Sequence, residues 1–479
     1  MNKHRWIVWS VPIFILLLNI VYKILFLGAR DINIDEPFTL FYSQMPWQEI
    51  FRMLHGENNP PLYFLVMHAW IELFGIEPFQ VRLLSLCFSA FSSVLIYFLG
   101  ARNFSRSVGI SAALLFTFSN FNTYLAQEAR VYALFVFLAL TSVYLFLKLI
   151  KEFKPKTLIF LIVINILLIY SHFFAFWLLL IEYIFVLLFP DIRKKLFKPF
   201  LIMTGILLVA FLPYLMIFIN RFLASSGGTW LEPPTVSSIY NLLWKFCNQP
   251  VPTVIVIIIL IIGLCKYVFL RFKGTISIDK ATWFVLMWFI LPTSIIFIIS
   301  FSLPVFYEKY LVFLAPALYL LVSRAILFIT KKDPIRLGLF IILISGFIIT
   351  STPRPYYSRS VTLLSNDLKS LRNNRDPVLI TPGYYDKTLI YYYNRNWFKD
   401  HQNFDQLLQK HLFIPVYNPA STLSMEFVDK TQVFLVEAGS QYLDPTGIVL
   451  ENLMLQFDSV EKVEYDNVVK LFILRKNGK

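Results

Sequence analysis

The chain has 479 residues, of which 57% are hydrophobic and 15% are charged, and its mean hydropathy is +0.65. Soluble domains average about 45–50% apolar and about 25% charged residues, so this composition excludes a soluble cytosolic enzyme of two or three domains. The formal net charge is +14, but the tail from Arg354 onward holds 15 basic and 14 acidic residues. The excess charge therefore lies between apolar runs, which indicates membrane topology rather than a nucleic-acid partner.

Eleven apolar runs approach the length of about 20 residues that a membrane-spanning helix needs. In chain order they cover residues 6–27, 80–100, 107–121, 130–149, 157–172, 174–189, 199–222, 251–270, 281–303, 307–329 and 337–351. The first run is long for the apolar part of a signal peptide and no clear cleavage site follows it, so we interpret it as an uncleaved helix.

The distribution of basic residues predicts the orientation of these helices. With the N-terminus in the cytoplasm, twenty Lys and Arg fall in inner segments and seven in outer segments up to residue 352. Cytoplasmic loops of membrane proteins are enriched in Lys and Arg. We therefore expect a multi-pass protein of the plasma (inner) membrane with an odd number of spans and an extracytoplasmic C-terminal tail.

Two regions outside the spans are long enough to have structure of their own. The first outer loop, residues 28–79, contains apolar helical patterns at 47–54 and 62–74, which predict helices lying along the membrane surface. The tail has strand patterns at 377–381, 432–437 and 468–474 and a helix pattern at 446–457. We predict a membrane module over residues 1–352 and a soluble α/β domain over residues 353–479, to which no chemistry is assigned.

Four polar clusters fall on the predicted outer side and are the candidates for chemistry. They are Asp35-Glu36 after the first span, Asn58-Asn59-Pro60-Pro61-Leu62-Tyr63 before the second surface helix, Gln127-Glu128-Ala129-Arg130 at the fourth span, and Ser171-His172 at the end of the fifth. An ionisable residue at membrane depth is costly, which makes Glu128 a functional candidate.

Each candidate also has a purely structural interpretation. Asp35 fits a solvated loop, and Glu128 fits a helix-start carboxylate paired with Arg130 or favoured by the helix dipole. His172 fits a hydrogen-bonded residue of the membrane interface, and Lys309 and Arg82 fit interfacial anchors. The residue types alone leave these alternatives open.

Several of these motifs together resemble a known family. Asp35-Glu36, the Pro60-Pro61-Leu62-Tyr63 segment and the QEARVYAL stretch from Gln127, in this order around a long first outer loop, are similar to the polytopic GT-C glycosyltransferases. The relevant members are the protein O-mannosyltransferase (dolichyl-phosphate-mannose-protein mannosyltransferase) and aminoarabinose transferase type. The resemblance covers about the first 220 residues, including the stretch Tyr170-Ser171-His172-Phe173, and weakens beyond them.

Two positions depart from the family pattern. Many relatives have His before the double proline, where this chain has Asn59, and Arg in a late motif, where it has Lys309 in Glu308-Lys309-Tyr310-Leu311. A metal ligand or a phosphate contact therefore differs from the family at these positions.

The resemblance implies an inverting transferase that moves a sugar from a polyprenyl-phosphate donor to a lipid, glycan or protein acceptor at the outer membrane face. It implies Asp35 as the catalytic carboxylate, Glu36 as its neighbour and Glu128 as a second acidic site residue. The residue chemistry agrees, since Asp35 can take the acceptor's proton and nearby cations can stabilise a departing phosphate. The substrate or phosphate contacts are assigned to Arg130, Lys309, Arg82, Asn59, Tyr63 and Gln127.

Cofactor use and two rival functions are left open. A divalent metal ion held by acidic residues and His172 is an alternative to the cations. A transporter or flippase of a lipid-linked saccharide would be expected to carry polar groups at the membrane midplane in repeated halves, which the sequence does not display. A tail that acts only as a receptor-like binding module would need far fewer spans.

Overall fold

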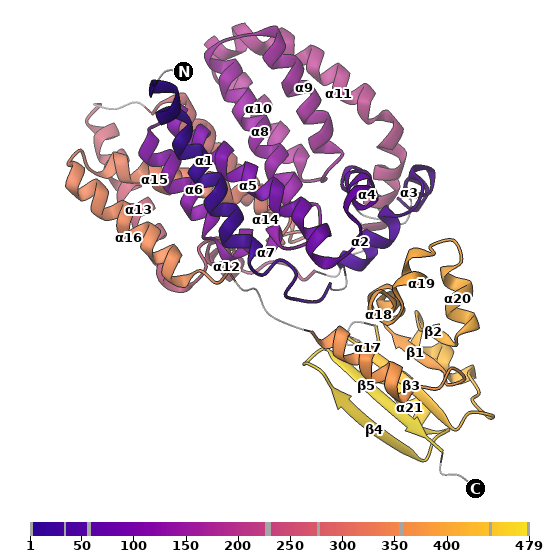
Figure 1. Cartoon of the computed structure of the whole chain (residues 1–479). Coiled ribbons are helices and arrows are strands. Elements are labelled where there is room, and N and C mark those ends of the chain that lie inside the picture. The colour runs from indigo at the N-terminus through magenta and orange to yellow at the C-terminus, as the bar shows by residue number, and fades with distance from the viewer. Residues whose placement is uncertain are drawn as a thin grey trace. The chain divides into compact units, whose positions relative to one another are not determined.

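The computed structural model describes residues 3–32, 35–54, 59–225, 231–274, 278–353, 359–439 and 443–476, so Asn58 of the second polar cluster lies outside the described residues. The chain folds as two compact units (Figure 1). The helical unit comprises Met1–Leu27, Glu49–Val66 and Phe79–Pro355, and the sheet unit comprises Gly28–Gln48, Met67–Pro78 and Tyr356–Lys479. The domain boundary expected at residue 352 stays a prediction. The domain expected over residues 353–479 did not include the loop segments Gly28–Gln48 and Met67–Pro78, which fold with the tail.

The helical unit contains the apolar helices. Seven described helices are long and apolar enough to cross a membrane. They are α5 (Pro78–Asn103), α8 (Tyr132–Lys151), α11 (Pro190–Ser225), α13 (Pro250–Phe272), α14 (Lys280–Ile299), η1 with α15 (Val312–Leu314 and Ala315–Ile329) and α16 (Asp333–Thr350). Four predicted runs form shorter apolar helices, namely α1 (Lys3–Ile24), α6 (Arg106–Thr117), α9 (Pro155–Ile169) and α10 (Ala175–Leu188). Each of the eleven predicted runs is thus helical, whereas eleven spans are not confirmed.

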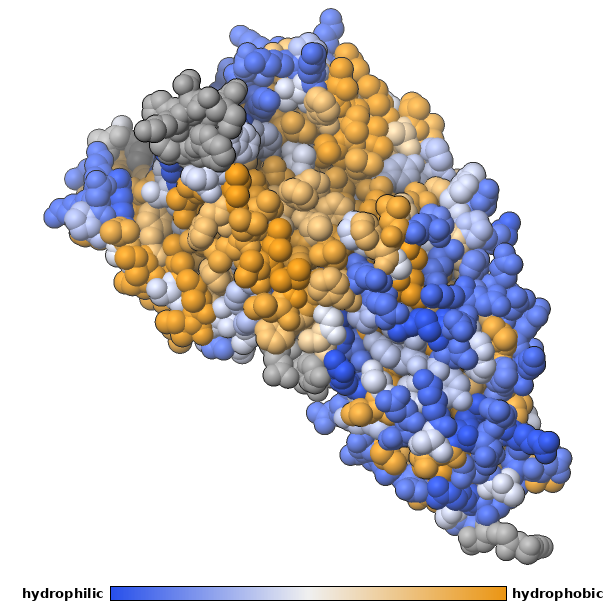
Figure 2. Space-filling view, in the orientation of Figure 1, coloured by the Kyte–Doolittle hydropathy of each residue, from blue (hydrophilic) through white to orange (hydrophobic). Residues whose placement is uncertain are grey.

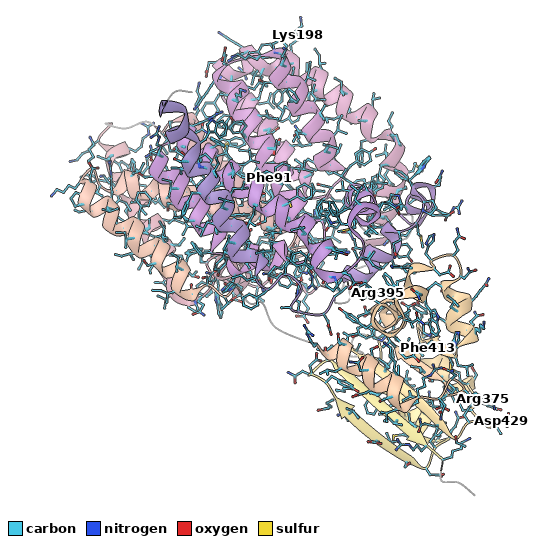
Figure 3. The ribbon with its side chains drawn as sticks, in the orientation of Figure 1. Phe91, Lys198, Arg375, Arg395, Phe413 and Asp429 are labelled. Atoms are coloured by element: carbon cyan, nitrogen blue, oxygen red, sulfur yellow. The ribbon has the colours of Figure 1, made fainter. Side chains whose placement is uncertain are left out.

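Burial separates the centre of this unit from its lipid-facing periphery. In the apolar stretches of α8 and α15, 67% and 72% of the residues are buried, against 22% in α13 and 17% in α16. Figure 2 shows apolar side chains over most of the visible face of the helical unit. Phe91, near the middle of α5, is 52% exposed, while Lys198 lies at one end of the helices (Figure 3). Exposed apolar side chains on this scale require a lipid environment.

Local sequence signals explain where several helices begin. Proline stands in the first turn of α9, α13, α15 and α16, where its missing N–H costs no helical hydrogen bond. Ser105 and Asp279 cap α6 and α14 with their side-chain oxygens. The remaining helices of this unit are α7 (Asn120–Ala126) and α12 (Val236–Phe246), while α3 (Trp47–Met53) and α4 (Leu62–Phe74) each have residues in both units. The two helices predicted for the first outer loop are confirmed as α3 and α4.

The sheet unit is built on a five-stranded mixed sheet with strand order β2-β1-β3-β5-β4. The strands are β1 (Val378–Thr381), β2 (Phe413–Pro415), β3 (Gln432–Ala438), β4 (Ser459–Glu464) and β5 (Val469–Arg475). β1 is parallel to β2 and β3, while β5 is antiparallel to β3 and β4. On one face, Leu435 and Phe472 pack with Val449 and Leu453 of the helix α21 (Ile448–Met454). The predicted strands at 377–381, 432–437 and 468–474 are confirmed.

Helices complete the sheet unit (Figure 1). They are α2 (Asp35–Ser43) from the first outer loop and α17 (Ser360–Leu371), α18 (Asp386–Tyr393), α19 (Arg395–Lys399), α20 (Phe404–Lys410) and α21 (Ile448–Met454) from the tail, with the short η2 (Gly383–Tyr385) and η3 (Pro419–Ser424). The helix predicted at 446–457 is α21. The visible face of this unit is mainly hydrophilic (Figure 2), in agreement with a soluble α/β domain.

Candidate active site

The QEAR cluster lies in an irregular turn between α7 and α8, just before the start of a long helix. α7 is held in place by Asn120, whose N–H donates to Asn248 Oδ1 at 2.7 Å and whose Nδ2 donates to the carbonyl of Thr350 at 3.0 Å. α8 begins at Tyr132, so the cluster precedes the helix that the sequence pattern started at Arg130. These contacts join the start of α7 to the turn between α12 and α13 and to the end of α16.

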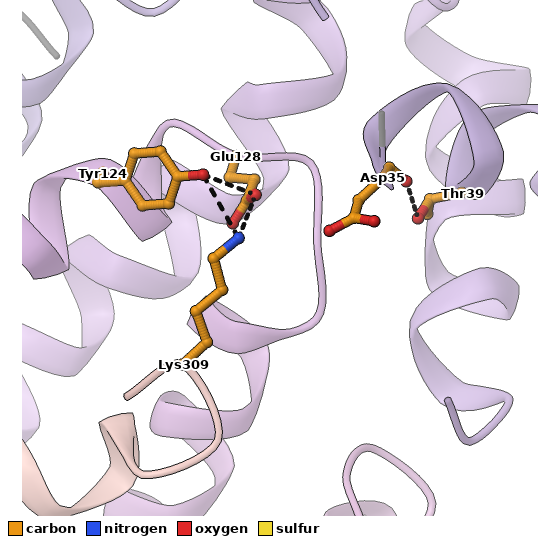
Figure 4. A network of polar contacts seen from close by, with 5 residues as sticks. All are labelled: Asp35, Thr39, Tyr124, Glu128 and Lys309. Atoms are coloured by element: carbon orange, nitrogen blue, oxygen red, sulfur yellow. Dashed lines mark hydrogen bonds and ion pairs between the residues drawn. The ribbon is translucent and has the colours of Figure 1, made fainter. Parts of the chain in front are cut away.

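Glu128 is the best-defined member of the cluster (Figure 4). Its Oε1 accepts hydrogen bonds from Lys309 Nζ at 2.9 Å and from the Tyr124 hydroxyl at 3.1 Å. The side chains of Lys309 and Glu128 are only 13% and 5% exposed. Glu128 Oε2 is buried, and it has no hydrogen-bond partner among the residues that the structure describes. The site therefore holds a shielded ion pair with one carboxylate oxygen left to accept a further hydrogen bond.

Lys309 comes from the segment between α14 and η1, far from Glu128 in the sequence. Its ammonium group also donates to the Tyr124 hydroxyl at 3.3 Å and lies 5.1 and 5.5 Å from the ring centres of Tyr124 and Tyr132. Burial alone would lower the pKa of Lys309, but the attraction of Glu128 and of the neighbouring hydroxyls outweighs it and raises the pKa. Lys309 is therefore a permanent cation.

His172 lies in the turn between α9 and α10 and is enclosed by aromatic rings. Its ring stacks on Phe135 with centres 4.7 Å apart, and the ring centre of Tyr310 lies 5.6 Å away. Burial, and then the positive charge of Arg130, lower the pKa of His172 to about 3. The ring is therefore neutral, and because Nδ1 accepts the N–H of Phe174 at 3.1 Å, the proton resides on Nε2.

Arg130 shares this environment with the other charged groups. Arg130 is 8% exposed. Its positive charge is close enough to interact electrostatically with His172 and with the Tyr132 hydroxyl. The charges of Lys309 and Glu128 also interact with the Tyr132 hydroxyl. The structure thus brings Glu128, Arg130, Lys309 and His172 to one place in the helical unit. Tyr124 and Tyr310 were missed. Tyr124 lies four residues before Glu128, a spacing that places two side chains on one helical face.

The other predicted binding residues of the helical unit have structural partners. Arg82 is fully buried and donates from Nη1 to the carbonyl of Leu27 at 3.1 Å, just beyond the end of α1. The Tyr63 hydroxyl lies 3.1 Å from Ser85 Oγ, and Gln127 Nε2 donates to the carbonyl of Lys23 at 2.8 Å. Asn59 is partly buried three residues before the start of α4, and the N–H of Leu62 donates to the carbonyl of Tyr170 at 3.0 Å.

Asp35 and Glu36 occupy the first turn of α2, in the sheet unit. Asp35 is exposed, whereas Glu36 is 1% exposed. The Thr39 hydroxyl donates to the main-chain carbonyl of Asp35 at 3.1 Å, and the Asp35 carboxylate takes no part in this hydrogen bond (Figure 4). Negative charge is favoured at a helix N-terminus, where the backbone N–H groups point outward.

Comparison with known proteins gives one partial family match and several structural ones. The family model of dolichyl-phosphate-mannose-protein mannosyltransferases matches residues 58–217, less than half of the chain. No curated protein sequence matches. The structure of ArnT from Cupriavidus metallidurans bound to undecaprenyl phosphate is similar with a TM-score of 0.59 at 14% identity, over 98% of each chain. The chain has the fold of the GT-C glycosyltransferases.

Two further GT-C structures agree. AglB, the archaeal oligosaccharyltransferase from Archaeoglobus fulgidus in complex with an inhibitory peptide and a dolichol-phosphate, has a TM-score of 0.52 at 9% identity, over 98% of this chain and 74% of AglB. Arabinofuranosyltransferase AftD from Mycobacteria has a TM-score of 0.53 at 12% identity, over 99% of this chain and 40% of AftD. The predicted resemblance and the fold class, a polytopic helical protein with a small C-terminal α/β domain, are confirmed.

The predicted role of His172 as a metal ligand finds no support in its contacts. The Archaeoglobus fulgidus enzyme has also been crystallised with Zn and sulfate, with a TM-score of 0.53 at 11% identity over 93% of this chain and 70% of that chain. Within the described parts of this chain, no three His, Cys, Asp or Glu residues are grouped to hold a metal ion. Since Nδ1 of His172 accepts a backbone N–H and Nε2 carries the proton, this ring has no lone pair to offer. The donor set around His172 does not fit a divalent ion.

Proposed function

We propose that this protein is an inverting membrane glycosyltransferase that moves a sugar from a polyprenyl-phosphate donor to a lipid, glycan or protein acceptor at the outer membrane face. The observation that carries the proposal is the buried Glu128–Lys309 pair with its open carboxylate oxygen, of which Glu128 lies within the stretch that matches the mannosyltransferase family. Undecaprenyl phosphate and dolichol-phosphate are bound in two of the similar structures, which supports a donor of this class.

The charged groups of the helical unit suit a lipid-phosphate leaving group. When the bond between the anomeric carbon and the phosphate oxygen breaks, the electron pair leaves with the polyprenyl phosphate, whose negative charge grows. A preorganised cation in a site shielded from water stabilises this charge strongly. Lys309 supplies a fixed positive charge, and Arg130 can bind phosphate oxygens through two parallel N–H groups.

Glu128 suits recognition of the sugar. Its Oε1 is taken up by Lys309 and Tyr124, so Oε2 is the oxygen that can accept a hydrogen bond from a sugar hydroxyl. A buried acceptor left without a donor costs about 1–3 kcal/mol, and a bound sugar would recover that energy. Glu128 is therefore a substrate-binding residue in this proposal, and Lys309 fixes its orientation.

Asp35 suits the role of general base. Its carboxylate is exposed at the start of α2, where an acceptor hydroxyl can reach it. The acceptor oxygen attacks the anomeric carbon from the side opposite the phosphate while Asp35 takes its proton, so the configuration inverts. Glu36, the next residue in the first turn of α2, is buried.

The test is sugar transfer by the purified protein in detergent from a polyprenyl-phosphate sugar. We expect release of polyprenyl phosphate together with a glycosylated acceptor. Detergent leaves no second compartment, so a flippase would release nothing. Donors are chosen by extracting lipids from membranes that lack the protein, where the unused lipid-linked sugar accumulates. Absence of transfer from the accumulated donor, with any extracted acceptor, would reject the proposal.

The proposal also includes the location of the protein. Its apolar helices support a multi-pass membrane protein. A plasma (inner) membrane with a cytoplasmic N-terminus and an extracytoplasmic tail remains the arrangement that the basic residues favour. Labelling of single cysteines in intact cells, at Ser424 in the tail and at Lys194 in α11, tests it, and we expect only the former to react with a membrane-impermeant reagent.

A further inference from the structure

The chain that leads into α2 is fixed by the tail of the protein. The Asp31 carboxylate accepts two hydrogen bonds from Thr362, from its N–H at 2.8 Å and from its hydroxyl at 2.6 Å. The next residue, Ile32, donates its N–H to the Tyr392 hydroxyl at 2.5 Å. Asp31 is 8% exposed and Ile32 is fully buried, so water competes little for these bonds.

Asp31 takes the place of a missing helix cap. Thr362 is in the first turn of α17, whose initial N–H groups have no acceptor within the helix. The residue at the N-cap position of α17, Arg359, makes no capping hydrogen bond with its side chain. A carboxylate from 331 residues away in the sequence therefore satisfies this helix end, where negative charge is favourable.

The body of α2 is also packed against the tail. The ring of Phe41 meets Phe398 and Phe404 edge to face, with centres 5.5 and 4.7 Å apart. The ammonium group of Lys387 lies 5.2 Å from the centre of the Phe41 ring. α2 has nine residues, and helices shorter than about 12 residues are marginal without tertiary packing. The fold of α2 thus depends on contacts with the tail.

A second segment of the first outer loop is tied to the same helices. The Tyr391 hydroxyl donates to the carbonyl of Ile76 at 2.6 Å, and Arg395 forms an ion pair with Glu77 at 3.5 Å. The guanidinium of Arg395 stacks on the Tyr391 ring at 3.3 Å from its centre (Figure 3 labels Arg395). Two separate loop segments therefore converge on α18 and α19.

We propose that the tail positions the general base: the Asp31–Thr362 contact and the packing on Phe41 hold α2 so that Asp35 has a fixed location. This inference rests on the proposed function, because it gives Asp35 the role of the base. Thr362, Asp31 and Tyr392 are positioning residues and touch no substrate. A displacement of about 1 Å at a reacting group costs up to about 10²-fold in rate, so small changes in these contacts have measurable effects.

The experiment compares variants of the full-length chain in the transfer assay. Thr362→Val removes the hydroxyl but keeps the backbone N–H, and Tyr392→Phe removes the bond to Ile32. We expect each to lower kcat about tenfold while the KM for the donor stays within about twofold. Thr362→Ser keeps a hydroxyl and is expected to restore kcat. The double variant Asp31→Ala with Thr362→Val is expected to lower kcat no further than Asp31→Ala alone, because both substitutions remove the same contact.

A matched control and a direct readout separate positioning from general damage. The Tyr465 hydroxyl donates to Asp367 Oδ2 of α17 at 2.7 Å, away from the outer loop. Tyr465→Phe therefore weakens the same helix without touching the chain into α2, and we expect its kcat to be unchanged. Amide hydrogen exchange of residues 35–43 should accelerate in Thr362→Val and Tyr392→Phe, while exchange of the sheet strands stays as in the parent chain.

The outcomes distinguish this inference from the proposed function. If Asp35→Asn is inactive but Thr362→Val and Tyr392→Phe have the parent's kcat and exchange, the positioning role is wrong and the base assignment stands. Equal losses of kcat in Tyr465→Phe and Thr362→Val would also overturn the positioning role. If Asp35→Asn turns over normally, the base assignment is lost, and exchange of α2 alone then reports whether the tail holds this helix.

Discussion

The two acidic sites of the molecule differ in burial and in the contacts that hold them. Glu128 is buried, paired with Lys309 and hydrogen-bonded to Tyr124. Asp35 is exposed at the start of a short helix, and that helix is held from outside through Asp31 and Phe41. A carboxylate that is neutralised by a cation is a poor proton acceptor but a good fixed hydrogen-bond partner. The difference is what the proposed roles rest on, substrate binding for Glu128 and proton transfer for Asp35.

The largest expected effect comes from removing the base. Asp35→Asn should lower kcat about 10³-fold, since a positioned general base contributes about 10²–10⁴-fold. Donor binding and the melting temperature should stay as in the parent chain, because the side chain is exposed. Glu49→Gln on α3, which breaks an exposed ion pair with Arg52, is the matched control and should be fully active. Turnover near the parent's rate in Asp35→Asn would remove Asp35 from the mechanism.

The ion pair should respond differently, through stability as well as binding. Lys309→Met leaves Glu128 buried without its cation and should destabilise the helical unit by about 3–5 kcal/mol. Glu128→Gln should raise the KM for the donor about tenfold or more, and the double variant should regain stability but not activity. The control is Glu308→Gln, which affects only the exposed pair with Lys245. Additive stability losses in the double variant would contradict the pairing.

The buried histidine should give the protein an acid limit of stability. The pKa of His172 is lowered to about 3, against about 6.5 in an unfolded chain. Its stabilising contribution is complete above pH 6.5 and is lost as the pH falls toward 3, by at most about 1.4 kcal/mol per pH unit. Melting temperatures measured from pH 7 to pH 4 should fall less steeply in His172→Asn. An unchanged slope would show that another group sets the limit.

The smallest effect should come from the tyrosine that the sequence analysis missed. Tyr124→Phe removes the hydroxyl that bonds to both Glu128 and Lys309 but keeps the ring beside the ammonium group. We expect a loss of about 1 kcal/mol in stability and a change of a fewfold in donor KM. A loss as large as that of Glu128→Gln would mean that Tyr124 itself contacts the substrate.

The sequence predicted the apolar helices well because their signal is local. Runs such as residues 251–270 and 337–351 are apolar on every side, and each became a helix, α13 and α16. Burial could not be predicted in this way, because lipid and protein surroundings both select apolar residues. The edge strand β4 was missed because five of its six residues are exposed and carry no alternating apolar pattern.

The sequence indicated which candidate residues would lie on one side of the membrane but not which contacts they make. Topology placed Glu128, Arg130, Lys309 and His172 on one side of the membrane, and they meet in the helical unit. Nothing in the sequence indicated that Arg82 bonds to the carbonyl of Leu27, because a partner 55 residues away leaves no local pattern. The cap that Asp31 provides for α17 escaped prediction for the same reason.

The hydrogen bonds between Asp31 and Thr362 can form only late in the synthesis of the chain. The ribosome makes Asp31 among the first residues and Thr362 only after the last apolar helix, α16. The short helix that carries Asp35 therefore waits for its support until all the hydrophobic segments have been produced. A nascent chain that stalls before this point would lack the contacts that hold the proposed base, so under the proposed function partly made molecules would transfer no sugar.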